Sequence, residues 1–126
     1  MINQDFNAEQ IFQEAMQAHQ NGQFQEAENL LRQVLEHLPN NDGIMTALGG
    51  ILLSSGKVNQ GIELFDQAIE INPSNIDAVL NKGIALQHLG KTDESFQFIT
   101  KAAELAPERA DAVSYTHLTL PTILLV

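Results

Sequence analysis

Glycine and proline recur along this chain at one shared interval. Both return every 34 residues, the glycine in the middle of each unit and the proline at its end. The glycines are Gly22, Gly56 and Gly90, and the prolines are Pro39, Pro73 and Pro107. A period of this length with two helix stops per unit is typical of stacked helical hairpins. The sequence therefore predicts an all-α fold, a solenoid of three antiparallel helix pairs.

The residues between these stops have helical spacing. Asn7, with Gln10 three residues later, resembles a capping box and predicts a first helix from about Ala8, with Gln10 reaching back to the cap. In a second helix, starting close to Gln23, the apolar residues are Phe24, Ala27, Leu31, Val34, Leu35 and Leu38. One partner helix covers only part of such a stripe, so each pair needs the next pair to stack on it.

Small residues occupy the places where the helices of a pair are expected to cross. One row is Ala15, Gly49 and Gly83, and the other is Ala27, Gly61 and Ser95. Larger side chains there would push the helix axes apart. Glycine inside a helix costs about 1 kcal/mol relative to alanine. We therefore expect Gly61→Ala to raise the thermal stability.

With these glycine, proline and small-residue places, residues 8–109 resemble three tetratricopeptide repeats. The resemblance implies a right-handed superhelix. The implied units are a lead-in, 1–7, the repeats 8–41, 42–75 and 76–109, and a truncated fourth repeat that opens at 110–112. Ile11, Met45 and Val79 stand where this family usually has tryptophan, so the first helices of the pairs are expected to be thinly packed.

Residues 113–126 break the helical pattern. Val113 to Thr122, VSYTHLTLPT, is similar to one translated frame of the transposon-end adapter used to build sequencing libraries. We interpret 113–126 as a non-native tail and exclude it from the fold prediction. Its apolar end is too short for a bilayer, which takes roughly 20 apolar residues. The natural protein is expected to continue differently after Ala112.

Charge and composition restrict the partners. The chain carries 16 acidic and 6 basic residues, for a net charge of -10. Nucleic acid and anionic membranes repel such a chain, so neither is expected as a partner. Cysteine is absent, which excludes disulfides and thiolate chemistry. The N-terminus lacks the basic start and apolar run of a signal peptide, so the cytoplasm is the default location.

No motif in the chain predicts catalysis or metal binding. His37 and Glu36 are sequence neighbours and point to different sides of a helix, so they form no two-ligand face. The glycine pair Gly49 and Gly50 lacks the lysine and the strand–turn–helix context of a phosphate loop. No Ser-His-Asp or HExxH arrangement is present. We expect no enzyme activity, no cofactor and no bound metal.

The resemblance implies a concave groove lined by the first helix of each pair. The implied groove residues are Phe12, Gln13, Met16 and His19, then Thr46, Ala47, Gly50 and Leu53, then Leu80, Asn81, Ile84 and His88. This set is mostly apolar, so an apolar helix or extended peptide of a partner protein is the expected ligand. The anchors expected for it are Phe12, Met16, Leu80 and Ile84. The alternative for these four is packing against neighbouring repeats.

Two functions follow from the resemblance. The first is a non-enzymatic protein-interaction scaffold. Some relatives hold acidic chaperone C-termini in a clamp of lysine, arginine and asparagine, but only Asn81 is of that kind, so no carboxylate clamp is expected. The alternative rests on FQEAMQAHQNGQFQEAENLLRQVLEHLPNN, which resembles the repeat arm of bacterial glycosyltransferases similar to O-GlcNAc transferase. Gln13 and Ala47 replace the groove asparagines typical of that enzyme, which counts against this alternative.

Overall fold

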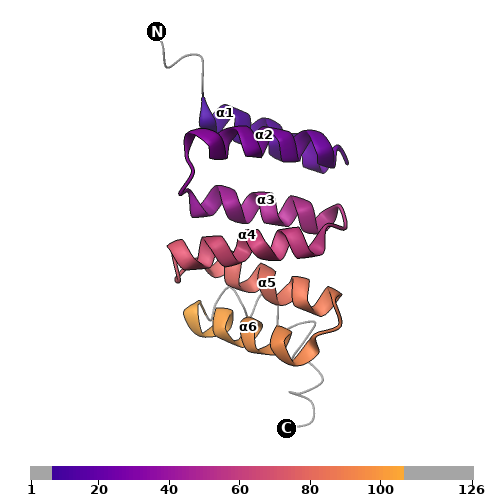
Figure 1. Cartoon of the computed structure of the whole chain (residues 1–126), viewed down its shortest axis with the longest axis vertical. Coiled ribbons are helices and arrows are strands. Elements are labelled where there is room, and N and C mark those ends of the chain that lie inside the picture. The colour runs from indigo at the N-terminus through magenta and orange to yellow at the C-terminus, as the bar shows by residue number, and fades with distance from the viewer. Residues whose placement is uncertain (1–6, 107–126) are drawn as a thin grey trace.

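A computed structural model describes residues 7–106, and every regular element in that range is a helix. The helices are α1 (Ala8–Gln20), α2 (Phe24–His37), α3 (Asp42–Ser54), α4 (Val58–Ile71), α5 (Ile76–His88) and α6 (Thr92–Leu105). They follow one another as a single stack of antiparallel hairpins (Figure 1). The predicted all-α solenoid is confirmed, and the predictions for residues 110–112 and 113–126 lie outside the described residues.

Asparagine side chains begin the first helix of each pair. In each case the side-chain oxygen accepts a backbone N–H that has no partner within the first helical turn. The donors and acceptors are Gln10 N to Asn7 Oδ1 (3.1 Å), Ile44 N to Asn41 Oδ1 (2.9 Å) and Ala78 N to Asn75 Oδ1 (2.9 Å). The return bond predicted for Gln10 is not formed within the described residues, and the Gln10 carboxamide Nε2 donates to Glu14 at 3.5 Å.

Left-handed glycines close the turn inside each pair. Gly22, Gly56 and Gly90 have φ angles of 82°, 89° and 80°. Glycine adopts this conformation without steric cost, whereas a side chain is strained there. The three glycines have open space around them, so the backbone angle rather than crowding requires glycine. The same turn therefore recurs in every unit.

Each helix packs on its chain neighbours, and α3 also contacts α5. The core is aliphatic: Leu31, Leu48 and Leu52 are fully buried in one cluster that joins the first pair to the second. Val79 and Ile99 form the centre of a second cluster in the third pair. The pairs thus bury their apolar stripes against one another, as the sequence pattern predicted.

The crossing of α3 and α4 is the place where the structure reverses an expectation. A Cβ added to Gly61 would lie 2.9 Å from the backbone oxygen of Gly49. A backbone atom cannot rotate away, so the two helices would have to separate. This strain outweighs the gain of about 1 kcal/mol in helix propensity. The expectation that Gly61→Ala stabilises the fold is therefore wrong, and the small residue is needed for the close crossing.

Candidate functional site

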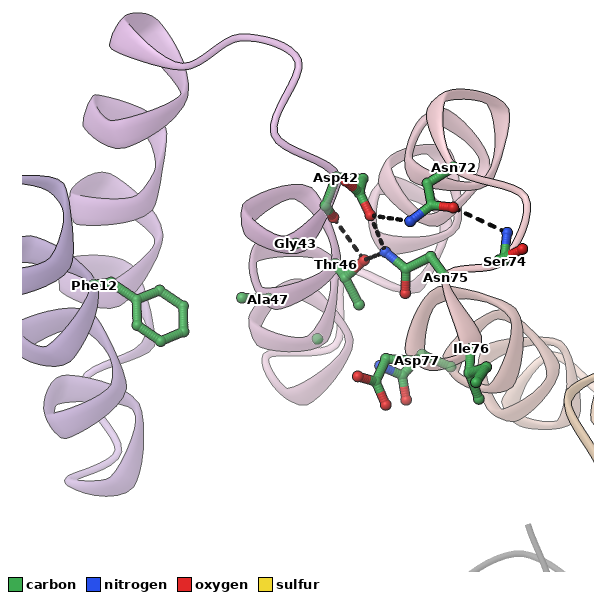
Figure 2. A pocket seen from close by; sticks show the side chains of 12 residues that line it. Phe12, Asp42, Gly43, Thr46, Ala47, Asn72, Ser74, Asn75, Ile76 and Asp77 are labelled. Atoms are coloured by element: carbon green, nitrogen blue, oxygen red, sulfur yellow. Dashed lines mark hydrogen bonds between the residues drawn. The ribbon is translucent and has the colours of Figure 1, made fainter. Parts of the chain in front are cut away.

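A pocket of about 580 Å³ opens on the face formed by α1, α3 and α5 (Figure 2). We call it the α3/α5 pocket. It is lined by Phe12 from α1, by Asp42, Gly43, Thr46, Ala47 and Gly50 from α3, by Asn72, Ser74 and Asn75 from the α4–α5 turn, and by Ile76, Asp77 and Asn81 from α5. Residues from three successive helix pairs meet here, so the pocket exists only in the stacked molecule.

One wall of the pocket is a hydrogen-bonded network that fastens the α4–α5 turn to the start of α3. Asn75 Nδ2 donates to Asp42 Oδ2 at 2.7 Å and contacts Thr46 Oγ1 at 3.1 Å. Asn72 Nδ2 donates to the same Asp42 oxygen at 3.2 Å, and the Thr46 hydroxyl donates to the Asp42 carbonyl at 2.8 Å (Figure 2). These bonds fix the wall, because each side chain is held from more than one direction.

The part of the lining on the α1 side of α3 is apolar. Phe12 is half-buried and its ring points from α1 toward α3, where Ala47 is also half-buried (Figure 2). Gly50 adds no side chain, and a Cβ built on it would meet no atom within 4 Å. Space is therefore left beside Gly50 for a group from outside the chain.

The charged residues that line the pocket are both acidic, Asp42 and Asp77. The cation of α5, Lys82, binds elsewhere: its Nζ pairs with Asp66 of α4 at 2.5 Å and lies 4.4 Å from the centroid of the Phe98 ring. Within residues 7–106, no lysine or arginine lines the pocket. The pocket therefore presents negative charge beside an apolar wall.

Five of the twelve predicted groove residues line the α3/α5 pocket, namely Phe12, Thr46, Ala47, Gly50 and Asn81. The other seven lie outside it. Leu80 is only 8% exposed and belongs to the core around Val79 and Ile99, as the packing alternative expected for it. Met16 and Ile84 are half-buried against the core, and Leu53 is also half-buried.

Three polar members of the predicted groove, Gln13, His19 and His88, lie outside the α3/α5 pocket. His19 Nε2 is 3.1 Å from Ser54 Oγ, and the His19 ring lies 5.5 Å from that of Phe24. Gln13 and His88 are exposed. No group of three or more histidine, aspartate or glutamate side chains that could hold a metal ion occurs within residues 7–106.

Sequence reasoning missed the polar wall. Asn75 caps α5 by accepting from Ala78 N, and no local pattern in the sequence indicates its second bond, to Asp42. A signal was present: successive first helices begin at the same end of a solenoid, so the capping residues of neighbouring pairs are spatial neighbours. That argument would have placed Asp42 beside Asn75.

Comparison with known proteins agrees with this fold. Two family models, both described as tetratricopeptide repeat, match residues 18–64 and 64–97, which together make up more than half of the chain. The chain belongs to the tetratricopeptide repeat family. Domains of this family are protein-interaction modules and are generally non-catalytic. No curated protein matches the sequence.

Several solved structures are similar to this one. The TPR domain of Arabidopsis OM64 superposes with a TM-score of 0.80 at 20% identity, covering 88% of this chain and 93% of that one. The first TPR domain of Spaghetti (RPAP3), bound to the HSP90 peptide SRMEEVD, gives 0.75 at 20% identity and covers 79% of each chain. The Sgt2 TPR domain from Aspergillus fumigatus gives 0.75 at 18% identity, covering 78% and 65%. At these identities the likeness concerns the fold.

None of the helices described within residues 7–106 has the length and apolar character that crossing a bilayer demands.

Proposed function

We propose that this chain is a non-enzymatic scaffold that binds a peptide or helix of a partner protein on the face of α1, α3 and α5, with the α3/α5 pocket at its centre. The observation that carries the proposal is the pocket itself. Its volume of about 580 Å³ lies within the usual range of about 300–1,000 Å³ for ligand sites, enough for a few side chains. The lining combines a fixed polar network with apolar residues, and this combination suits an amphipathic segment.

Asn81 is the residue suited to hold the main chain of such a segment. It lines the pocket, is half-buried, and its carboxamide forms no hydrogen bond within residues 7–106. An asparagine side chain both donates and accepts, as a peptide unit does. A ligand backbone that bonds to Asn81 would satisfy the carboxamide while the ligand side chains lie against Phe12 and Ala47.

The groove residues outside the pocket extend this surface in the proposal. Met16, Ile84 and Leu53 present half-buried apolar side chains, and Gln13, His19 and His88 form a polar edge. A carboxylate clamp is not part of the proposal, because such a clamp needs lysine or arginine side chains and none lines the pocket within residues 7–106. The glycosyltransferase-arm alternative is not adopted, since Ala47 and Gln13 occupy the places that match Asn81 in the earlier repeats.

The test fills the pocket without disturbing the fold. A phage-displayed library of random short peptides is selected on the whole chain, and the recovered peptides are titrated against variants. Gly50→Phe places a ring where a Cβ meets open space, so we expect the fold to remain and peptide binding to fall at least about tenfold. Glu63→Phe adds the same ring at an exposed position of α4, outside the pocket, and is expected to leave binding unchanged. Failure to recover any peptide, or equal binding by Gly50→Phe, would contradict the proposal.

A further inference from the structure

We infer that the segment bound in the α3/α5 pocket is an amphipathic α-helix that lies along α3, between α1 and α5. The inference rests on the proposed function, because it specifies the conformation of the same ligand. The lining on α3 extends from Asp42 to Gly50, about 12 Å of helix, and the lining on α5 from Ile76 to Asn81. Both are first helices of their pairs and run in the same direction (Figure 1). The pocket therefore follows the helix axes.

Small residues form the face of α3 that lines the pocket. Gly43, Ala47 and Gly50 are four and three residues apart, so they share one face of the helix. Figure 2 shows Phe12 on one side of α3 and Ile76 on the other. Two helices approach each other more closely where the side chains between them are small. This face therefore leaves room for a ligand helix that lies on α3.

Gly50 has no packing role within residues 7–106. A Cβ built on it would meet no atom within 4 Å. By contrast, a Cβ on Gly49 would lie 2.5 Å from the Phe65 ring, and one on Gly61 would lie 2.9 Å from the Gly49 oxygen. The α3–α4 crossing thus requires Gly49 and Gly61 but not Gly50, although a glycine inside a helix costs about 1 kcal/mol relative to alanine. We attribute Gly50 to the close approach of a ligand helix, the same use that the fold makes of the other two glycines.

The lining offers few partners for the main chain of an extended segment. Of its three carboxamides, those of Asn72 and Asn75 already donate to Asp42. The third, on Asn81, forms no hydrogen bond within residues 7–106. An extended segment presents an N–H and a C=O at every residue, and each one that is buried without a partner costs free energy, whereas a helix pairs these groups internally. One free carboxamide is therefore too few for an extended segment and enough for a helix.

Asn81 is then expected to bind one end of the ligand helix. The first N–H groups and the last C=O groups of a helix have no partner within it, and a carboxamide can accept from the former or donate to the latter. The other contacts are apolar, because Phe12, Ala47 and the open space beside Gly50 receive side chains from one face of the ligand. The opposite face points to solvent, so the ligand helix is amphipathic.

The experiment uses synthetic copies of the peptides recovered on the whole chain. In an alanine scan, we expect the residues needed for binding to recur at i, i+3 or i+4, and i+7, the spacing of one helical face. A lactam bond is then placed between two dispensable positions, i and i+4, on the opposite face. It should strengthen binding about five- to tenfold, because a short peptide is largely unfolded in water and loses conformational entropy on binding. The matched control is the same peptide with the lactam bond left open.

Gly50→Ala is the matching change in the chain. It adds one methyl group to the face of α3 on which the ligand helix is expected to lie, in space that is open in the unbound chain. We expect it to raise the melting temperature and yet to weaken binding of the lactam peptide about threefold. A more stable variant that binds less well cannot owe its weaker binding to unfolding. Unchanged binding by Gly50→Ala would contradict the close approach.

The outcomes separate the two proposals. Peptides that lose binding in Gly50→Phe, but need alternate residues and bind more weakly with the lactam bond, would be extended. That result would overturn the helix inference and retain the proposed function. A lactam peptide that binds the unmodified chain and Gly50→Phe equally would also overturn the helix inference, since the helix would then lie elsewhere. Recovery of no peptide sensitive to Gly50→Phe would overturn both.

Discussion

Two junctions join the three helix pairs. Matching positions in the two junctions carry different side chains, polar ones at the second junction and mostly apolar ones at the first. At the second junction, Asp42, Thr46 and Asn72 join Asn75 in the network of the α3/α5 pocket. The residues one period earlier are Ala8, Phe12 and Leu38, with Asn41 in place of Asn75. The first junction therefore has the cap but not the network.

An ion pair, by contrast, links the helix pairs at the first junction. At the first junction Lys57, from the α3–α4 turn, binds Glu28 of α2, and Glu28 also binds Arg32. One period later these places hold Lys91 and Ile62, so no carboxylate stands at the matching place. The stacking of pairs is set by the shared apolar pattern, and the polar groups are free to differ from junction to junction. Such a difference allows a binding site to form at one junction only.

The strongest test of this contrast compares the two capping asparagines. Asn75→Ala removes the α5 cap and leaves Asp42 and Thr46 without their Asn75 partner, so we expect a loss of about 2–3 kcal/mol in the free energy of unfolding. Asn41→Ala removes a cap alone and should cost about 1 kcal/mol. Urea denaturation of both variants measures the difference. Equal losses would mean that the network adds nothing to the cap.

The second test concerns the middle pair, which both junctions share. Gly61→Ala is expected to lower the free energy of unfolding by about 1–2 kcal/mol, because the new Cβ would lie 2.9 Å from the Gly49 oxygen. Gly50→Ala adds a Cβ in open space on the adjoining helix and should raise it by about 0.5–1 kcal/mol. Thermal melts of the two variants should therefore shift in opposite directions. A higher melting temperature for Gly61→Ala would show that the crossing tolerates a methyl group.

The smallest expected effect is the contribution of the ion pairs at the first junction. Burial acts to raise the pKa of Glu28, but the hydrogen bonds and charges of Arg32 and Lys57 outweigh it, so the pKa lies below the usual 4.5. The folded state thus favours the carboxylate, and its stabilisation is present above about pH 4.5 and lost as the pH falls below that value. We expect Glu28→Gln to cost about 1 kcal/mol at neutral pH.

The pH dependence of that cost is the measurement. Unfolding of Glu28→Gln and of the unmodified chain should differ at neutral pH and converge as the pH falls below 4.5. Gln33→Glu adds a carboxylate at an exposed position of the same helix and serves as a control for the effect of changing the charge of α2 as such. A cost that stays constant into acid would indicate that packing, rather than the carboxylate charge, accounts for the role of Glu28.

The helices and turns could be predicted from the chain because their causes are local. An asparagine cap acts on a backbone N–H three residues away, and a left-handed glycine closes a turn within its own unit. Apolar spacing shows that each pair has a second face to cover, which is enough to predict stacking. The apolar part of the candidate site, Phe12 and Ala47, follows from the resemblance to tetratricopeptide repeats, which implies a groove lined by the first helix of each pair.

Contacts across the stack were decided by distances that no local pattern contains. Asp42 and Asn75 meet only because two pairs stack in one register, so the polar wall was missed. Helix propensity gave the wrong sign at Gly61 because the cost there comes from the neighbouring helix. Local hydrogen bonding and periodicity set where each helix begins and ends, whereas inter-helix separation sets which side chains share a pocket.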